Sequence, residues 1–282
     1  MPTNIRIGRR LLAAAALSTS IGALASCAAP PPSVALTEDN HVHELATSPD
    51  GQSLLVATHN GLFTVVLADG DVRGPAGDLR IDLMGMTVAE HALLASGHPG
   101  TSGPQPLRGP NVGLIRSDDL GESWDAVSLE GVADFHALTY DPKAETIVGS
   151  HAGQLLISED MGVSWREGAA VDTYDLLAAD RGLLMTSFAG LSSSLDGGGT
   201  FEPVADAPAL VLLGGSGDAI VGVDQQGALW ESGPDEAWRA MGTTPEQVSA
   251  LTRLPDGDVV VAGESGLQRT SDQGRTWRPL QS

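Results

Sequence analysis

The sequence predicts an all-β fold, a six-bladed β-propeller, on three observations. A glycine that opens an apolar strand after a turn recurs six times, at steps of about 40 residues, which is typical of propeller blades. A second turn motif recurs in phase with the first. Residues 41–282 are also numerous enough for one large all-β domain, so the repeats need no second fold.

The glycine repeat defines the blades. Successive glycines are 52, 40, 37, 37 and 39 residues apart, and they are Gly61, Gly113, Gly153, Gly190, Gly227 and Gly266. The one long step contains residues 100–106, a stretch of turn-forming residues that we interpret as a loop insertion. Blades are therefore expected to start near residues 41, 81, 132, 173, 209 and 247, each a small sheet that buries its faces only against its neighbours.

The second motif is a turn with an aspartate, a glycine and an aromatic residue. Residues 117–124 (Ser-Asp-Asp-Leu-Gly-Glu-Ser-Trp) are matched by 158–165, 194–201 and 270–277. The motif resembles the Asp-box, or BNR repeat, of bacterial sialidases, sortilin-type receptors and photosystem assembly propellers, which implies a sialidase-like propeller. An aspartate can accept the N–H groups of its turn, and the aromatic ring can pack between sheets. We expect a structural role for these aspartates, which are Asp119, Asp160, Asp196 and Asp272.

The first 26 residues are predicted to be a lipoprotein signal peptide. Three arginines precede an apolar run from Leu11 to about Leu24 that is short for a membrane span. The run ends in Leu-Ala-Ser-Cys, which resembles the lipobox of bacterial lipoproteins and implies a lipid on Cys27, the sole cysteine. An ordinary secreted protein is the alternative, and both the Sec and the twin-arginine export routes stay open.

These segments divide the chain into a signal peptide (1–26), a lipidated cysteine with a Pro-rich tether (27–40) and the propeller (41–282). We expect an exported protein, anchored by its lipid to the outer face of the cell membrane. Without residues 1–26 the chain has 12 basic and 36 acidic residues, a formal charge of −24. This charge excludes nucleic acid as a partner, because binding to phosphates needs clusters of Lys and Arg. We expect a monomer, and a glycan or a protein as the ligand.

Histidines are concentrated in the first three blades, since all seven precede residue 152. Three close the second strands, and others begin the first strands, which line the channel of a propeller. With nearby Met and Asp side chains they form a candidate metal site made of His41, His43, His59, Met84, Met86, His98, Asp134, His136 and His151. Because His with Met is a soft-to-borderline ligand set, copper is the first candidate and zinc or iron the next. The alternative is a set of polar channel residues that bond to one another and to water.

Several phrases around these histidines, such as His41-Val42-His43-Glu44-Leu45 and Asp134-Phe135-His136-Ala137-Leu138, resemble exported propellers of the F510/1955-type glycosylhydrolase family. The resemblance covers nearly all of residues 41–282 and implies a sialidase-like hydrolase. Sialidases need three arginines and a tyrosine nucleophile, yet no arginine lies between Arg10 and Arg73. The two tyrosines are expected to pack, and Glu44 and Asp82 are conceivable acids.

The sequence therefore leaves three functions open. The preferred one is a membrane-anchored binding or scaffold lipoprotein with a His/Met metal site in the channel. The second is a sialidase-like exo-glycosidase, although the arginine triad is not evident. The third is a platform for protein assembly that uses the inserted loop, residues 99–110, as its contact.

Overall fold

The computed structural model describes residues 36, 40–100, 107, 109–235 and 237–281. The predicted signal peptide, Cys27 and residues 101–106 of the inserted loop lie outside the described residues. No helix in the described ranges is long and apolar enough to cross a membrane.

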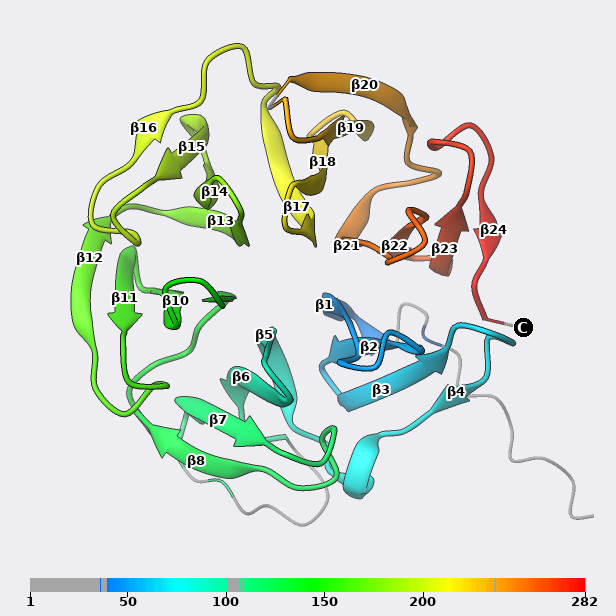
Figure 1. The fold of residues 1–282 in the computed structure, drawn as a ribbon. Helices are drawn as coiled ribbons and strands as arrows, with labels where there is room; N and C mark the ends of the chain where they lie inside the picture. The colour runs from blue at the N-terminus through cyan, green and yellow to red at the C-terminus, as the bar shows by residue number, and fades with distance from the viewer. Residues whose placement is uncertain (1–35, 37–39, 101–106, 108, 236, 282) are drawn as a thin grey trace, which may run out of the picture. The chain divides into compact units, whose positions relative to one another are not determined.

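Six antiparallel sheets of four strands follow one another along the chain and form a ring, which confirms the predicted six-bladed propeller (Figure 1). Each sheet consists of four consecutive strands, and the first strands contact one another around the centre. Blades 1 to 3 comprise β1 (Val42–Thr47), β2 (Ser53–Thr58), β3 (Gly61–Val66), β4 (Val72–Arg73), β5 (Asp82–Ala89), β6 (Ala92–His98), β7 (Leu114–Ser117), β8 (Asp125–Ser128), β9 (Ala137–Asp141), β10 (Thr146–His151), β11 (Gln154–Ser158) and β12 (Arg166–Ala170).

Blades 4 to 6 repeat the arrangement. They comprise β13 (Thr173–Ala179), β14 (Gly182–Ser187), β15 (Gly190–Ser194), β16 (Glu202–Pro203), β17 (Leu210–Ser216), β18 (Ala219–Asp224), β19 (Ala228–Ser232), β20 (Trp238–Thr243), β21 (Val248–Arg253), β22 (Val259–Gly263), β23 (Gly266–Thr270) and β24 (Arg278–Pro279). A short 3-10 helix, η2 (Ala76–Asp78), connects blades 1 and 2. Five first strands begin within one residue of the predicted blade starts, whereas β9 begins at Ala137, because a turn after Leu129 delays it.

Apolar side chains fill the interfaces between neighbouring blades, so that each sheet buries both faces. The second strands are apolar without alternation for this reason, and Leu54, Leu55 and Val56 on β2 are all fully buried. The interface of blades 1 and 6 closes the ring and includes the buried Leu36, whose N–H lies 3.4 Å from the side-chain oxygen of Gln281.

The four turns with the repeated aspartate lie between the third and fourth strands of their blades, on the outer hairpins. In the first turn, Asp119 accepts the backbone N–H of Ser123 at 2.9 Å and its hydroxyl at 2.6 Å. The other three turns repeat this pair of bonds, and the bonds lower the pKa of all four aspartates, that of Asp272 to about 2. The aromatic residue of each turn packs between blades.

A β-bulge interrupts the first strand at one equivalent place in five blades. The register shifts lie at 42/44, 83/85, 173/175, 210/212 and 248/250, and only β9 pairs regularly along its length. A bulge adds one residue to a strand and re-aims the side chains beside it. In these five blades the bulge therefore determines which side chains near the start of the first strand face the centre.

Candidate metal centre

The antiparallel pairing of the first two strands of each blade brings the histidines together. Because Val42 pairs with Thr58, the start of β1 lies beside the end of β2. The same holds in blade 2, where Asp82 on β5 pairs with His98 on β6. Side chains at the starts of first strands and the ends of second strands thus share one edge of the sheets.

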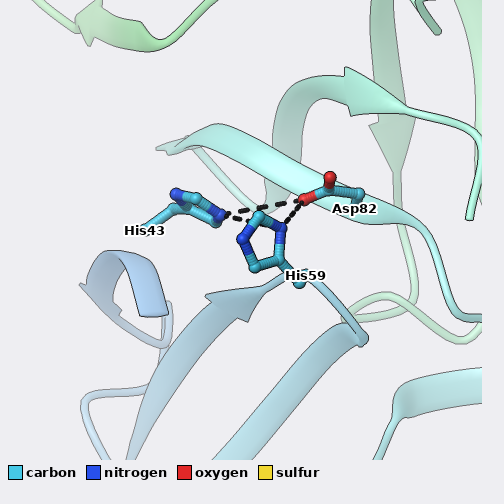
Figure 2. A group of neighbouring side chains, drawn as sticks. All are labelled: His43, His59 and Asp82. Atoms are coloured by element: carbon cyan, nitrogen blue, oxygen red, sulfur yellow. Dashed lines mark hydrogen bonds and ion pairs between the residues drawn. The ribbon is translucent and has the colours of Figure 1, made fainter. Parts of the chain in front are cut away.

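The tightest group consists of His43, His59 and Asp82 (Figure 2). His43 Nε2 lies 3.2 Å from His59 Nδ1, and His59 Nδ1 lies 2.7 Å from Asp82 Oδ1. The third distance, from His43 Nε2 to Asp82 Oδ1, is 3.7 Å. His41 also joins the group through its ring, whose centroid is 4.8 Å from that of His43. Blades 1 and 2 therefore supply two imidazole nitrogens and one carboxylate oxygen to one point.

The spacing of these three atoms matches a metal ion. A triangle with sides of 3.2, 2.7 and 3.7 Å has a circumradius of about 1.9 Å. Zinc binds histidine nitrogen and carboxylate oxygen at about 2.0–2.1 Å, so an ion at that distance from all three atoms lies about 0.6–0.9 Å out of their plane. A tetrahedral ion lies about 0.7 Å above the plane of three of its ligands and keeps a fourth position open. The cluster could hold a metal ion without rearrangement of these atoms.

The electrostatic environment keeps His43 neutral. Burial lowers its pKa to about 3, and charges on His59, His41, His136 and His98 would lower it further, in that order. A metal ligand must be an unprotonated imidazole, because the ion binds the nitrogen lone pair. His43 thus meets this condition over the whole physiological pH range.

A second group surrounds Asp134, in the segment before β9. The carboxylate oxygen Oδ2 lies 3.2 Å from His98 Nε2 and 3.5 Å from His136 Nδ1. His151, at the end of β10, contacts the backbone of Asp134 through Nδ1 at 3.2 Å. Asp134 is buried, whereas His136 is exposed, so the group opens to solvent on the side of His136.

Met84 and Met86, the two methionines of the predicted site, lie on β5. Met86 is buried in the apolar cluster between blades 1 and 2, and Met84 is half-buried. The atoms that the structure brings together at His43 are thus nitrogens and an oxygen. Sequence reasoning had not included Asp82 as a ligand, although it precedes the first apolar residue of its strand just as His41 does in blade 1.

The central cavity is a separate feature. It has a volume of about 700 Å³ and is lined by the first strands and by the hairpins that follow them. Two of its carboxylates, Glu44 on β1 and Asp175 on β13, occupy equivalent positions of opposite blades. Asp175 accepts N–H groups from Leu176 and Leu213, each at 2.7 Å.

Burial dominates the ionisation of this pair. It raises the pKa of Asp175 to about 7, against the effect of its backbone hydrogen bonds. It also raises the pKa of Glu44 well above the usual range, and repulsion by Asp175 adds to the effect. The pair thus retains a proton near neutral pH. The sequence did not predict this pair, because which residues of two opposite blades face each other depends on the strand register within each blade.

Comparison with known proteins identifies the fold. No protein-family model and no curated sequence matches the chain. Among solved structures, an ancestral GH74 enzyme is similar with a TM-score of 0.52 and 12% identity, over 84% of this chain and 38% of that chain. A catalytically inactive virginiamycin B lyase from Staphylococcus aureus, solved with quinupristin, has a TM-score of 0.55 and 14% identity, over 88% of this chain and 87% of that chain.

The extracellular domain of BT4673 from B. thetaiotaomicron, described as a hybrid two-component system, has a TM-score of 0.52 and 13% identity, over 85% of this chain and 33% of that chain. This chain spans well under half of the GH74 and BT4673 chains and most of the lyase. At these identities the similarity concerns the fold, which occurs both in enzymes and in the extracellular domain of a two-component system.

Proposed function

We propose that this protein is a metal-binding propeller that acts outside the cytoplasm as a binding or scaffold module. The observation that carries the proposal is the spacing of His43 Nε2, His59 Nδ1 and Asp82 Oδ1, which fits an ion at bonding distance from all three. Two imidazoles and a carboxylate are typical of zinc sites and of non-haem iron sites. We therefore expect zinc first and iron second. Copper comes third, because we expected it on the basis of methionine ligands, and no methionine is among these three residues.

The hydrogen bonding of His59 supports an ion at this point. One ring nitrogen carries either a proton or a lone pair, yet His59 Nδ1 faces both a carboxylate oxygen and another imidazole nitrogen. A proton on His59 Nδ1 could bond to both His43 Nε2 and Asp82 Oδ1 only as one bifurcated hydrogen bond. A metal ion would bind all three atoms at once. The open fourth position would accept water or a donor atom from a ligand.

Metal analysis tests the proposal. Protein purified without chelators is expected to retain one zinc or iron ion on these three residues, and the double variant His43→Ala plus Asp82→Asn is expected to lose it. The matched control is His91→Ala, since His91 is an exposed histidine in a turn of blade 2. If the folded double variant retains the same metal content as the control, the proposed site is wrong.

The location of the protein is part of the proposal. The lipobox-like tetrapeptide that ends at Cys27 supports a lipid anchor at the outer face of the membrane, and the formal charge of −24 without residues 1–26 supports solubility of the propeller there. In that position the propeller would present its metal to a glycan or protein ligand. A role as an assembly platform through residues 99–110 is the third option.

The carboxylate pair in the central cavity favours a second candidate function, glycoside hydrolysis. Many glycosidases use one protonated and one ionised carboxyl group, and the similar GH74 protein is an enzyme. Glu44 and Asp175 share the cavity with Tyr140, whose pKa is raised mainly by burial. A panel of fluorogenic glycosides and sialosides tests this function: turnover must be present in the wild type and abolished in Glu44→Gln and Asp175→Asn.

A further inference from the structure

Blade 4 exposes two aromatic side chains at the histidine edge, the edge of the propeller where first strands start and second strands end. Thr173 on β13 pairs with Ser187 on β14, so Tyr174 and Phe188 both lie at this edge. Histidines occupy the equivalent positions in blade 1. Phe188 is 93% exposed and Tyr174 is 45% exposed. Single exposed apolar residues are common on protein surfaces, so the meaning of these two depends on what the histidine edge faces.

Leu36, the described residue nearest to Cys27 along the chain, lies at the same edge. It is buried at the seam of blades 1 and 6, and its carbonyl oxygen would lie 3.0 Å from a Cβ atom added to Gly266. Gly266 follows the turn between the second and third strands of blade 6. The corresponding turn of blade 4 is the one that contains Phe188. The chain that leads to Cys27 therefore joins the propeller at the histidine edge.

The length of this connection limits where the lipid can be. Cys27 and Leu36 are nine residues apart in the sequence, and nine fully extended residues span at most about 32 Å. The opposite edge of the propeller lies a whole strand length away, which is about 27 Å for the eight residues of β5 at about 3.4 Å per residue. A chain that ran outward past the blades and then over this depth would use nearly all of its reach or exceed it. A lipid on Cys27 is therefore expected on the side of the histidine edge.

The distribution of acidic residues agrees with this orientation. In every blade, the hairpin between the first and second strands carries an acidic residue at the edge opposite the histidines. These residues are Asp50, Glu90, Asp141, Asp180, Asp218 and Asp256. The turns after the second strands include an acidic residue only in blades 5 and 6, at Asp224 and Glu264. An anionic lipid surface repels the more acidic edge, and this repulsion favours the orientation in which the histidine edge faces the lipid.

We propose that the histidine edge faces the membrane and that Phe188, with Tyr174 on the same blade, contacts the lipid headgroup region. The inference rests on the proposed lipid anchor at Cys27. Blade 4 lies across the ring from blade 1, so the anchor and the aromatic contact hold this face of the propeller at two separate points (Figure 1). Aromatic side chains are common at membrane interfaces, and burial of an apolar ring there strengthens attachment by a single lipid. The metal site at His43 would then face ligands at the membrane surface.

Fluorescent labels on two residues of blade 4 test the orientation. Ala189→Cys and Leu195→Cys are labelled with an environment-sensitive fluorophore in the full-length protein, in which the lipid blocks the thiol of Cys27. Ala189 is exposed beside Phe188, and the matched control Leu195 is 89% exposed in the aspartate turn at the opposite edge. In vesicles of phosphatidylethanolamine and phosphatidylglycerol, the label at position 189 is expected to emit at shorter wavelength and to be quenched by brominated lipid. The label at position 195 is expected to show neither change.

The variant Phe188→Ser isolates the contribution of the ring. When it is combined with Ala189→Cys, quenching by brominated lipid is expected to fall, because the ring no longer draws this turn into the headgroup region. Phe188 is almost fully exposed, so its replacement should leave the fold intact. Quenching that is unchanged by Phe188→Ser would overturn the proposed contact of Phe188 with lipid.

Flotation of the wild type with the vesicles distinguishes failure of the anchor from failure of this inference. If the wild type carries no lipid and does not float, the anchor is wrong and the orientation that rests on it is overturned too. If it floats but the labels at positions 189 and 195 are quenched alike, only the orientation is overturned. A label at position 189 that is shielded in a dimer of the detergent-solubilised protein, and not by lipid, assigns Phe188 to a contact with a second copy and also overturns the proposal.

Discussion

Phe135 connects the stability of the propeller to the position of the polar side chains on either side of it. It stands between Asp134 and His136, its side chain is fully buried, and its ring centroid lies 5.0 Å from that of Trp165. Truncation of a fully buried Phe to Ala typically costs 3–5 kcal/mol, from lost burial and from the cavity left behind. For a domain of this size that cost lowers Tm by roughly 6–20 °C, at about 2–4 °C per kcal/mol. We expect Phe135→Ala to fall in this range.

The assay is urea unfolding followed by tryptophan fluorescence. Trp165 packs on the ring and supplies a fluorescence signal. Val132→Ala is the control, since Val132 is 61% exposed in the same segment and its truncation should change stability by less than about 0.5 kcal/mol.

A double-mutant cycle with Gly149 tests the reasoning further. A Cβ atom on Gly149 would lie 2.5 Å from the ring of Phe135, so Gly149→Ala alone is expected to destabilise by about 1–3 kcal/mol through overpacking. In Phe135→Ala plus Gly149→Ala the new methyl group enters the vacated space, and the double variant should lose less than the sum of the single losses. Additive losses, or a loss below about 1 kcal/mol for Phe135→Ala, would refute the account.

Three further predictions follow from the metal centre, the cavity and the N-terminal segment. Removal of the metal ion from the His43 site with a chelator should destabilise the protein by about 2.7 kcal/mol if free zinc had been at 100 times its Kd, and urea unfolding with and without zinc measures this. Because burial raises the pKa of Glu44 and Asp175, their contribution to stability is present at acidic pH and is lost as the pH rises to about 7. The free energy of unfolding of Glu44→Gln should therefore rise relative to that of wild type from pH 5 to pH 8. In the control Glu264→Gln, which changes an exposed residue, it should follow wild type. Parallel pH curves for Glu44→Gln and wild type would contradict the argument. Cys27→Ser should release the protein from membranes into the soluble fraction and abolish labelling by radioactive palmitate, and labelling of the variant would contradict lipidation at Cys27.

The fold could be predicted from sequence because each blade repeats one local pattern. The glycine of the repeat has positive φ in every blade, as at Gly61 and Gly190, and other residues adopt this conformation less readily, so the repeat can be recognised in the sequence. The apolar second strand and the turn with its aspartate mark the same unit again. Repetition made the number of blades and nearly all of their starting points readable.

The candidate site could be predicted only in outline. Equivalent strand positions indicate that histidines of neighbouring blades share an edge. His43 does contact His59, and His98 and His136 both contact the carboxylate of Asp134. Alternation within a strand was a poorer guide, because the β-bulge between Leu83 and Gly85 interrupts it. The bulge changes which faces Met84 and Met86 present, and Met86 packs between blades.

In the part of the chain that the structure describes, no sheet combines strands from both ends of the chain, since the last sheet consists of four consecutive strands like the others. The seam between the first and last blades is closed by apolar packing and by the contact of Leu36 with Gln281. Closure of the ring therefore does not require the ends of the polypeptide to lie between blades 1 and 6. The ends of the propeller can be joined by a short linker, and new ends can be opened in another connection between blades. Such a circular permutation would change how the edge that carries the histidines is oriented relative to the surface to which the protein is attached.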